Sequence, residues 1–394
     1  MANIICSSLG SGGDILPFLR IGSRLRRRGH HVTLISHCYW EDAAEKAGIH
    51  FSAIDSAPEY SRFVNDEPLL NSPRGIPEFL RRHVFTKVPA EYDIIRQRSR
   101  TDQTFLITRD LFDTGIRISA EKLGIPFMTI FVAPSQLATW KIRVELFRQA
   151  CSDEINRLRN QMSLPSVSNW KSWLAYPATS LALWPDWFAG RDPAWPPGVT
   201  PVGFIIDQGH SDQVPADLQT YLSSGEQPIL ITGGTGLYLG AEFYKTSAEA
   251  CSLLKRRAVL VTQHREHVPE DFRDSFRWFD YLPFNKVMKN VAAVIHHGGR
   301  GTLSSAIAAG VPQLVLAMGA DRPDNAIRLK GLGVADYLPP PAWQPAAVAE
   351  KLSAIIHSEV AAQTCRTLAA RMAATDALGS ACDLIERVIA EGQG

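Results

Sequence analysis

Short apolar runs alternate with amphipathic segments along the first third of the chain. The apolar runs are residues 3–7, 31–36, 50–54, 105–108 and 127–132, and the amphipathic segments are residues 15–25, 42–47 and 114–123. Glycine follows each amphipathic segment, at Gly29, Gly48 and Gly124, as is common where a helix ends. Strands that alternate with helices in this way form parallel β–α units, whose sheet is covered by helices on both faces.

The same alternation restarts after Pro228. Strands are predicted at residues 229–232, 258–262, 276–279, 294–297 and 313–317, and helices at residues 242–255, 286–290, 303–309, 324–332, 346–357 and 377–391. Two α/β domains are therefore predicted, which also agrees with the length of 394 residues. Clusters of proline, glycine and polar residues around positions 195–212 place the boundary near residue 207.

Two segments depart from this alternation. Residues 71–100 carry seven Arg or Lys residues against three acidic ones, with Phe79, Leu80, Val84 and Phe85 among them. Such a segment is either solvated surface or a face that contacts an anionic membrane or a lipid-like substrate. Residues 138–187 hold five tryptophans and one clear helix, at residues 144–162. Those aromatic residues belong either to the core or to an apolar pocket for a bulky ligand.

Composition narrows the function classes. The formal net charge of +1 gives no indication of nucleic-acid binding, and 45% hydrophobic with 21% charged residues is typical of a soluble globular protein. The six cysteines are widely spaced, which favours reduced, mostly buried thiols. The N-terminus lacks the basic region of a signal peptide, and no run of 18 apolar residues exists. We therefore expect a cytoplasmic protein, and the basic segment leaves peripheral contact with the inner face of a membrane as an alternative.

Three glycine-rich turns follow predicted strands, at residues 10–13, 233–236 and 298–301. Glycines allow close approach of the backbone, and a helix N-terminus after such a turn attracts anions. The first turn matches the dinucleotide-binding fingerprint poorly. Ile15 occupies the position of the third glycine, and no acidic residue ends the second strand. The alternative for any one of these turns is a plain connection between a strand and a helix.

Four motifs together resemble the GT-B, UGT-like (GT1-type) family of nucleotide-sugar-dependent glycosyltransferases. They are GSGGDILPF at residues 10–18, WP with VGF at 195–204, HHGGRGT at 296–302, and AGVPQ followed by GADRPDNA at 309–326. The chain is most similar to the bacterial branch that acts on lipids, sterols and natural products, including the rhamnosyltransferases of rhamnolipid synthesis. This resemblance implies two Rossmann-like domains that face one another across a cleft, an N-terminal acceptor domain (1–207) and a C-terminal donor domain (208–375). A last helix (376–394) would return to the first domain.

The resemblance also implies an inverting transfer of a hexosyl group from a UDP- or dTDP-sugar to a hydroxyl of an apolar acceptor. Asp14 would be the general base, since an aspartate carboxylate is ionised at neutral pH and can accept the hydroxyl proton. Its alternative role is an N-cap, which Asp favours in any protein. Asp110 is a second catalytic candidate, and Asp110 and Asp113 are alternatively caps of the following helix.

The donor would be bound mainly by the glycine-rich turns. The expected donor-binding residues are Gly12, Gly13, Gly234, Thr235, Leu282, Phe284, His297, Gly299, Arg300, Gly301, Thr302, Asp321 and Arg322. Backbone N–H groups of the 299–302 turn, the Thr302 hydroxyl and His297 would hold the leaving diphosphate without a metal or other cofactor. Arg322 departs from the family, which usually has Gln after the aspartate. A guanidinium donates but cannot accept hydrogen bonds. This departure from the family therefore argues against assuming that the transferred sugar is a neutral hexose.

Acceptor binding is expected from Trp140, Phe147 and Trp173 in the tryptophan-rich segment. His264 and His267 have metal-ligand spacing, but no third ligand is near them in sequence, so a surface pair is expected. A Gly-x-Ser-x-Gly motif is absent from the sequence, which excludes an esterase-type nucleophile elbow. The alternative functions are a non-catalytic ligand-binding homologue or activator, and a nucleotide-sugar epimerase. The expected assembly is a monomer or a homodimer.

Overall fold

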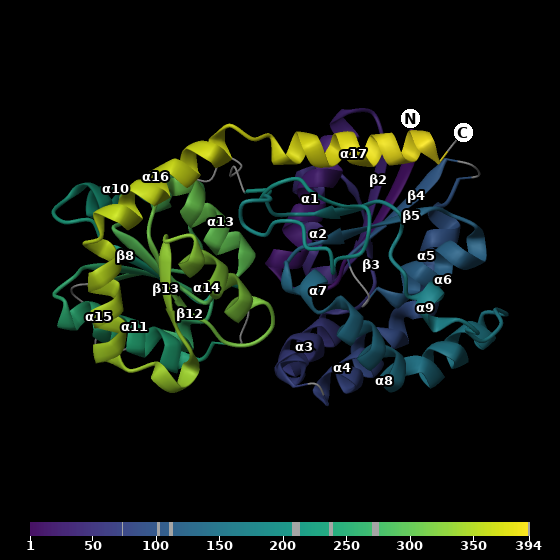
Figure 1. Ribbon diagram of the computed structural model, residues 1–394, viewed down its shortest axis with the longest axis horizontal. Coiled ribbons are helices and arrows are strands. Elements are labelled where there is room, and N and C mark those ends of the chain that lie inside the picture. The colour runs from purple at the N-terminus through teal and green to yellow at the C-terminus, as the bar shows by residue number, and fades with distance from the viewer. Residues whose placement is uncertain are drawn as a thin grey trace. The chain divides into compact units, whose positions relative to one another are not determined.

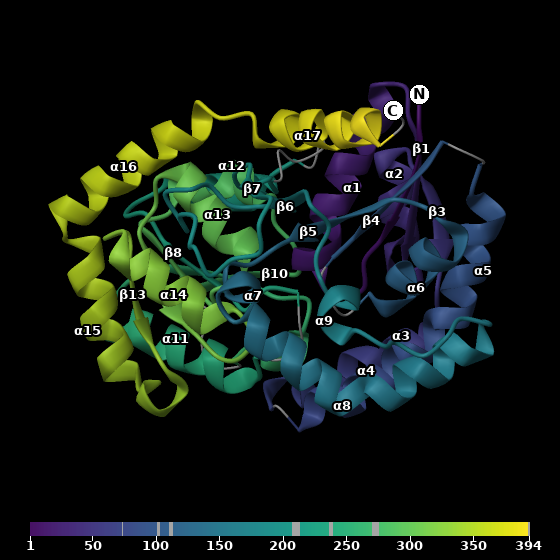
Figure 2. The ribbon, with the colours of Figure 1, turned by 45° about the vertical axis from the view of Figure 1, so that its right-hand side comes forward.

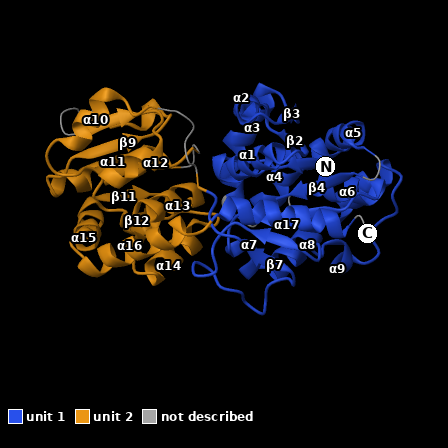
Figure 3. Ribbon diagram, turned by 90° about the horizontal axis from the view of Figure 1, so that it is seen from above, with its two compact units in different colours: residues 1–205, 376–394 blue, residues 206–375 orange. Residues whose placement is uncertain are grey.

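The computed structural model describes residues 1–72, 74–100, 103–109, 113–206, 213–235, 239–269 and 276–392. The chain forms two compact units (Figure 3). Unit 1 comprises Met1–Ile205 and Asp376–Gly394, and unit 2 comprises Ile206–Thr375. The first division thus lies two residues before the expected boundary after residue 207, and the second lies between residues 375 and 376.

Unit 1 is built on a parallel sheet of seven strands in its described part. The strands are β1 (Asn3–Ser7), β2 (His31–Ser36), β3 (His50–Ala53), β4 (Thr104–Thr108), β5 (Phe127–Phe131), β6 (Ser180–Ala182) and β7 (Val199–Pro201). Their order is β3-β2-β1-β4-β5-β6-β7, with Cys6 of β1 paired with Leu34 of β2 on one side and Ile107 of β4 on the other. The direction of winding therefore reverses between β1 and β4, and ligands of such sheets bind beyond the carboxyl ends of the strands at this point.

Helices surround this sheet. They are α1 (Gly12–Arg27), α2 (Glu41–Ala47), α3 (Ala57–Asp66), α4 (Gly75–His83), α5 (Val88–Arg98), α6 (Thr114–Leu123), α7 (Ser135–Ala138), α8 (Trp140–Gln161), α9 (Trp170–Trp173) and α17 (Ala377–Glu391), with 3-10 turns η1 (Cys38–Trp40), η2 (Glu67–Asn71) and η3 (Phe85–Lys87). The 71–100 segment, which departs from the alternation in the sequence, is thus mostly helical in its described part. Its helices are short and separated by 3-10 turns, so no long apolar period develops.

The apolar residues of the basic segment face the interior. Phe79, Leu80, Val84 and Phe85 are all buried, and Leu80, Val84 and Phe85 pack with Phe147 of α8. These four side chains therefore offer no apolar surface to a membrane, and peripheral contact through the basic residues of the segment stays a prediction.

The last helix belongs to the first unit, as the sequence predicted. Helix α17 runs beside α1 (Figures 1 and 2). Ile385 and Ile389 of α17 lie in the same apolar cluster as Phe18 of α1. At the rim, Nη1 of Arg28 lies 2.6 Å from Oδ1 of Asp383 and 2.7 Å from Oε2 of Glu386. Apolar burial therefore attaches α17 to α1, and exposed ion pairs of this kind add little.

Unit 2 holds a second parallel sheet, in the order β10-β9-β8-β11-β12-β13. Its strands are β8 (Ile229–Thr232), β9 (Ala258–Val261), β10 (Phe276–Phe279), β11 (Ala293–His296), β12 (Gln313–Leu316) and β13 (Ala335–Leu338). Its helices are α10 (Ala216–Ser223), α11 (Ala241–Leu253), α12 (Phe284–Val287), α13 (Arg300–Ala309), α14 (Arg322–Gly331), α15 (Pro345–Ile356) and α16 (Glu359–Ala373), with η4 (Arg265–His267), η5 (Met288–Asn290) and η6 (Pro340–Ala342). Here the winding reverses between β8 and β11, so both units have the strand order of a Rossmann-like fold, as predicted.

Two further expectations concern the whole chain. In the described ranges, none of the helices combines the length and apolar character that a membrane crossing requires. Five of the six cysteine thiols are buried, and Cys38 is half-buried.

Candidate active site

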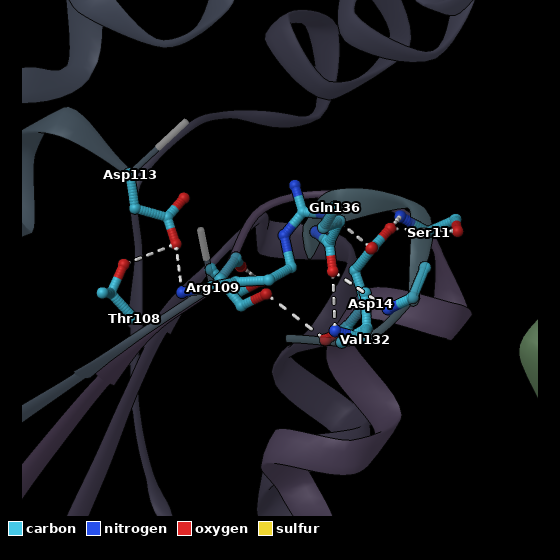
Figure 4. A network of polar contacts seen from close by, with 10 residues as sticks. Ser11, Asp14, Thr108, Arg109, Asp113, Val132 and Gln136 are labelled. Atoms are coloured by element: carbon cyan, nitrogen blue, oxygen red, sulfur yellow. Dashed lines mark hydrogen bonds and ion pairs between the residues drawn. The ribbon is translucent and has the colours of Figure 1, made fainter. Parts of the chain in front are cut away.

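The two strands at the reversal point of unit 1 bring Asp14 and Arg109 together (Figure 4). Asp14 follows β1 and Arg109 follows β4, its neighbour in the sheet. Nη1 of Arg109 lies 2.5 Å from Oδ1 of Asp14. The other carboxylate oxygen, Oδ2, accepts a 3.0 Å hydrogen bond from the backbone N–H of Ser11. Both oxygens of Asp14 thus have defined partners, which fixes the orientation of the carboxylate.

Asp14 is not the N-cap of α1. Ser11 holds that position, and Asp14 is the third helical residue, whose side chain reaches back to the Ser11 backbone as in a capping box. The N-cap alternative for Asp14 is therefore wrong by three positions, although the carboxylate does serve the helix start. Gly12 and Gly13 are the first two helical residues and lie beside it.

Asp113 positions Arg109. Its Oδ2 atom accepts hydrogen bonds of 2.8 Å from the Thr108 hydroxyl and from the backbone N–H of Arg109 (Figure 4). Asp113 is buried and also precedes α6 as its N-cap residue. Asp113 therefore begins the helix, as predicted, and also fixes the end of β4 that leads into Arg109. Asp110, the second catalytic candidate, and Gly236 of the second turn lie outside the described residues.

A buried carboxyl group behind this site was not predicted. The Glu91 side chain is buried, accepts a hydrogen bond from the Ser7 hydroxyl at the end of β1, and packs where Gly115 lacks a side chain. Burial, with the nearby charge of Asp113, raises the pKa of Glu91 to about 8. Glu91 is thus protonated at neutral pH.

In unit 2 the first of the paired histidines shapes the turn after β11. The backbone N–H of Gly298 donates to Nδ1 of His296 at 3.0 Å, so the ring proton lies on Nε2 and faces Oε1 of Gln313, 2.9 Å away. Burial lowers the pKa of His296 to about 4. His296 is therefore a neutral, structural residue that holds Gly298 in its left-handed conformation, at φ 94°.

The second histidine lies between two glycine-rich turns. A Cβ atom on Gly234 would lie 2.6 Å from Cε1 of the His297 ring, and a Cβ atom on Gly299 would overlap the same ring. Gly234 also has a φ of 79°, which disfavours any side chain. Gly234 and Gly299 thus need to be glycine because the imidazole occupies the space between the turns after β8 and β11. Burial and the charge of Arg322 hold the pKa of His297 well below its ordinary value, so the ring is neutral and offers one N–H.

Helix α13 begins directly after this turn, with Gly299 as N-cap. The N–H groups of the first turn of a helix have no intrahelical acceptor and carry the positive end of the dipole. Arg300 and Thr302 are buried there and Gly301 is exposed. Thr235, in the turn after β8, is also exposed. The arrangement is an anion-binding cradle at the reversal point of the unit 2 sheet.

The loop after β12 is tied to this cradle. Nδ2 of Asn325 donates to the Gly298 carbonyl at 3.0 Å and to Oδ2 of Asp321 at 2.8 Å. Arg322 donates from Nη1 to the Met318 carbonyl at 3.1 Å. The loop turns at Ala320, whose φ of 51° is uncommon for a residue with a side chain. Asp321 and Arg322 thus lie beside the turn that carries His297. Asn325, which was not among the predicted site residues, links Asp321 to that turn.

Leu282 and Phe284 lie at the other predicted donor position. Leu282 is buried in a cluster with Val287 and Met288, and Phe284 is half-buried against the same cluster. Packing accounts for Leu282 fully, so contact with a nucleobase stays a prediction for both residues.

The predicted acceptor residues have structural contacts of their own. Phe147 is buried with its ring centroid 6.4 Å from that of Phe85, and Nε1 of Trp140 donates to the Ala194 carbonyl at 2.5 Å. Nε1 of Trp173 donates to Glu121 at 2.8 Å, beside the Arg159 guanidinium. Acceptor binding by these three side chains stays a prediction.

His264 directly precedes η4, and His267 is its last residue. The ring centroids of His264 and His267 are 5.3 Å apart, and His264 faces Glu266. Across the described ranges, His, Cys, Asp and Glu side chains form no group of three that could hold a metal ion.

Comparisons with known proteins identify the family of each unit. Residues 4–140 match the glycosyltransferase family 28 N-terminal domain, and residues 256–383 match the C-terminal domain of erythromycin biosynthesis protein CIII-like proteins. The O-mycaminosyltylonolide 6-deoxyallosyltransferase of Streptomyces fradiae is 26% identical over 96% of each chain. The vancomycin aglycone glucosyltransferase of Amycolatopsis orientalis is 27% identical over 94% of this chain and 96% of its own.

Solved structures show the same fold. The glycosyltransferase VinC in complex with dTDP has a TM-score of 0.74 at 18% identity, covering 99% of this chain and all of VinC. SsfS6 from Streptomyces sp. SF2575, complexed with thymidine diphosphate, has a TM-score of 0.69 at 21% identity, covering 98% of this chain and all of SsfS6.

The two Rossmann-like units and these matches define a nucleotide-sugar-dependent glycosyltransferase with the GT-B fold. Within that class the chain belongs to the GT1-type family of natural-product and sterol glycosyltransferases, with a family 28 N-terminal domain and a CIII-like C-terminal domain.

Proposed function

We propose that this glycosyltransferase moves a hexosyl group, with inversion, from a dTDP- or UDP-sugar to a hydroxyl of an apolar small molecule. The observation that carries the proposal is the cradle in unit 2, where the α13 N-terminus, two glycine-rich turns and a neutral histidine converge. A leaving nucleoside diphosphate gains negative charge as the glycosidic bond breaks, and such a cradle stabilises that charge.

In this proposal the anion-binding cradle holds the diphosphate of the donor without a metal ion. The first-turn N–H groups of α13, the Thr302 hydroxyl and the single N–H of His297 would bind the diphosphate. Because His297 is neutral, it contributes a directed hydrogen bond and no charge. Asp321, held by Asn325, would accept hydrogen bonds from the sugar hydroxyls. Thymidine donors are the first to test, because VinC and SsfS6 were solved with dTDP and thymidine diphosphate.

Asp14 would be the general base. The acceptor oxygen forms a bond to the anomeric carbon, the bond from that carbon to the diphosphate oxygen breaks, and the hydroxyl proton passes to the Asp14 carboxylate. The fixed orientation of that carboxylate supports the assignment, since Ser11 and Arg109 each hold one of its oxygens. The acceptors named for relatives, a tylonolide macrolide and the vancomycin aglycone, support a bulky natural product as the acceptor.

The test is Asp14→Asn, assayed by mass spectrometry in a screen of dTDP- and UDP-sugars against apolar hydroxylated acceptors. We expect turnover to fall by about 10²–10⁴-fold, the usual contribution of a general base. Binding of dTDP should persist, because Asp14 lies in unit 1 and the cradle in unit 2.

Asp93→Asn is the matched control, since Asp93 is an exposed carboxylate of the same unit. An Asp14→Asn enzyme with wild-type turnover would refute the base assignment. Conversion of the nucleotide sugar without any acceptor would instead indicate an epimerase.

A further inference from the structure

The ion pair of Asp14 and Arg109 is partly exposed. The side chains are 20% and 15% exposed, so both keep some contact with solvent. The position of Arg109 is set by its own backbone, which donates to the buried carboxylate of Asp113. Arg109 therefore does not resemble a surface arginine whose guanidinium happens to meet an acid.

This pairing has a chemical consequence for proton transfer. Arg109 places a positive charge beside the carboxylate oxygen of Asp14 that would accept the acceptor proton. The same cation stabilises any other oxyanion that forms within hydrogen-bond reach. An acceptor oxygen that hydrogen-bonds Oδ1 of Asp14 on the side of Arg109 also comes within reach of Nη1, because these two atoms are 2.5 Å apart.

We propose that Arg109 binds the acceptor oxygen as it becomes an oxyanion, and that this contact selects acceptors with an acidic hydroxyl, namely phenols and enols. The inference rests on the proposed function and specifies the acceptor class of that reaction. As the acceptor O–H proton passes to Asp14, the oxygen gains negative charge, which the Arg109 guanidinium stabilises while that oxygen attacks the anomeric carbon. When the new glycosidic bond is complete, the oxygen is neutral, the bond from the anomeric carbon to the diphosphate oxygen is broken, and the negative charge leaves with the diphosphate.

A structural role for Arg109 has different consequences. If the ion pair merely held Asp14 in place, removing the guanidinium would slow transfer to every acceptor by a similar factor. If Arg109 binds the reacting oxygen, the loss is largest for acceptors whose oxygen carries most charge in the transition state. The dependence of rate on acceptor acidity separates the two roles.

The experiment compares 2-naphthol with 2-naphthylmethanol, which share one ring system but differ in hydroxyl acidity. A phenol has a pKa of about 10, whereas an alkyl hydroxyl is close to water, at about 16. Each acceptor is assayed with dTDP-glucose and UDP-glucose, using wild type, Arg109→Gln, Arg109→Lys and the control Arg96→Gln, an exposed arginine of unit 1. Thermal unfolding of each variant shows that the chain still folds.

We expect wild type to favour 2-naphthol by at least tenfold in kcat/KM. Arg109→Gln should lower kcat for 2-naphthol by about 10²–10³-fold, the usual cost of losing an oxyanion donor. The fall for 2-naphthylmethanol should be smaller, Arg109→Lys should retain part of the preference, and Arg96→Gln should resemble wild type.

Two outcomes overturn the inference while the proposed function stands. These are equal use of both acceptors by wild type, and an equal fall for both acceptors in Arg109→Gln. Absence of product from both naphthyl acceptors also overturns it, provided that other hydroxylated acceptors are glycosylated. The proposed function itself fails only when no acceptor yields product with any donor.

Discussion

The imidazole ring of His297 occupies the space that a side chain on Gly299 would need. Gly299 has an ordinary φ of −68°, so its requirement for glycine comes from this contact alone and not from backbone conformation. Two residues further on, a Cβ atom on Gly301 would meet nothing within 4 Å. Substitutions at Gly299 and Gly301 therefore test the packing of His297, because only the first would contact the ring.

We predict that Gly299→Ala displaces His297 and weakens dTDP binding by about tenfold or more, at a stability cost of about 1–3 kcal/mol from overpacking. Gly301→Ala should leave stability unchanged or raise it by about 0.5–1 kcal/mol, because alanine favours the helix. Calorimetric titration with dTDP and thermal unfolding measure both effects. Equal dTDP affinity in the two variants would show that the His297 ring can move without consequence.

Acid should destabilise unit 2 through His296. Its pKa is about 4 in the folded chain and 6.5 ordinarily, so the unfolded chain binds more protons between these values. Stability is therefore complete above pH 6.5 and is lost as the pH falls towards 4. From pH 7.5 to pH 5 the loss from this residue is about 2 kcal/mol.

Denaturant unfolding at these two pH values measures the loss. His296→Gln should make the stability less dependent on pH, whereas the same change at the exposed His50 should not. An unchanged pH dependence in His296→Gln would contradict the burial of a neutral ring.

Glu91→Gln should stabilise unit 1. The folded pKa of about 8 exceeds the ordinary value of 4.5, so folding takes up a proton between these values and the cost rises with pH. An amide of the same shape removes that cost, which is up to about 3 kcal/mol at pH 7. The gain should nearly vanish at pH 4.5. A variant that is less stable than wild type at pH 8 would show that the carboxyl group is needed for its contact with Ser7.

The last helix should carry part of the stability of unit 1. Ile385 is fully buried against α1, so Ile385→Ala should cost about 2–5 kcal/mol by removing apolar contacts and leaving a cavity. Arg387→Ala, an exposed position two residues away, should change the stability by less than about 0.5 kcal/mol. Equal unfolding midpoints for the two variants would contradict the packing of α17 on α1.

The sequence predicted those elements whose apolar period was long enough to recognise. Strands β1, β2 and β8 and helices α6 and α17 lie at the predicted residues. Strands β6 and β7 have three residues each, which is too short to show an alternation of apolar and polar residues. Helices α10 and α16 and strand β13 were also missed.

The site was predictable where neighbours in sequence form it. The turn at residues 298–302 follows a strand and begins a helix, and its glycines and histidines are adjacent in the chain. Arg109 was missed because it is 95 residues from Asp14, and only the placement of β4 beside β1 brings them together. The tryptophan-rich segment illustrates the opposite problem, since composition cannot distinguish a ring that packs against Glu121, as Trp173 does, from one that binds a ligand.

The return of α17 to unit 1 has a consequence for synthesis of the chain. Unit 2 is continuous in sequence, so all of it has been translated before α17 emerges from the ribosome. Unit 1 is the first to be translated but the last to complete its core, because the apolar face of α1 packs against Ile385 and Ile389 of α17. A nascent chain therefore cannot bury that face with α17 until the last residues are translated, whereas a permuted chain beginning with α17 could bury it as soon as α1 emerges.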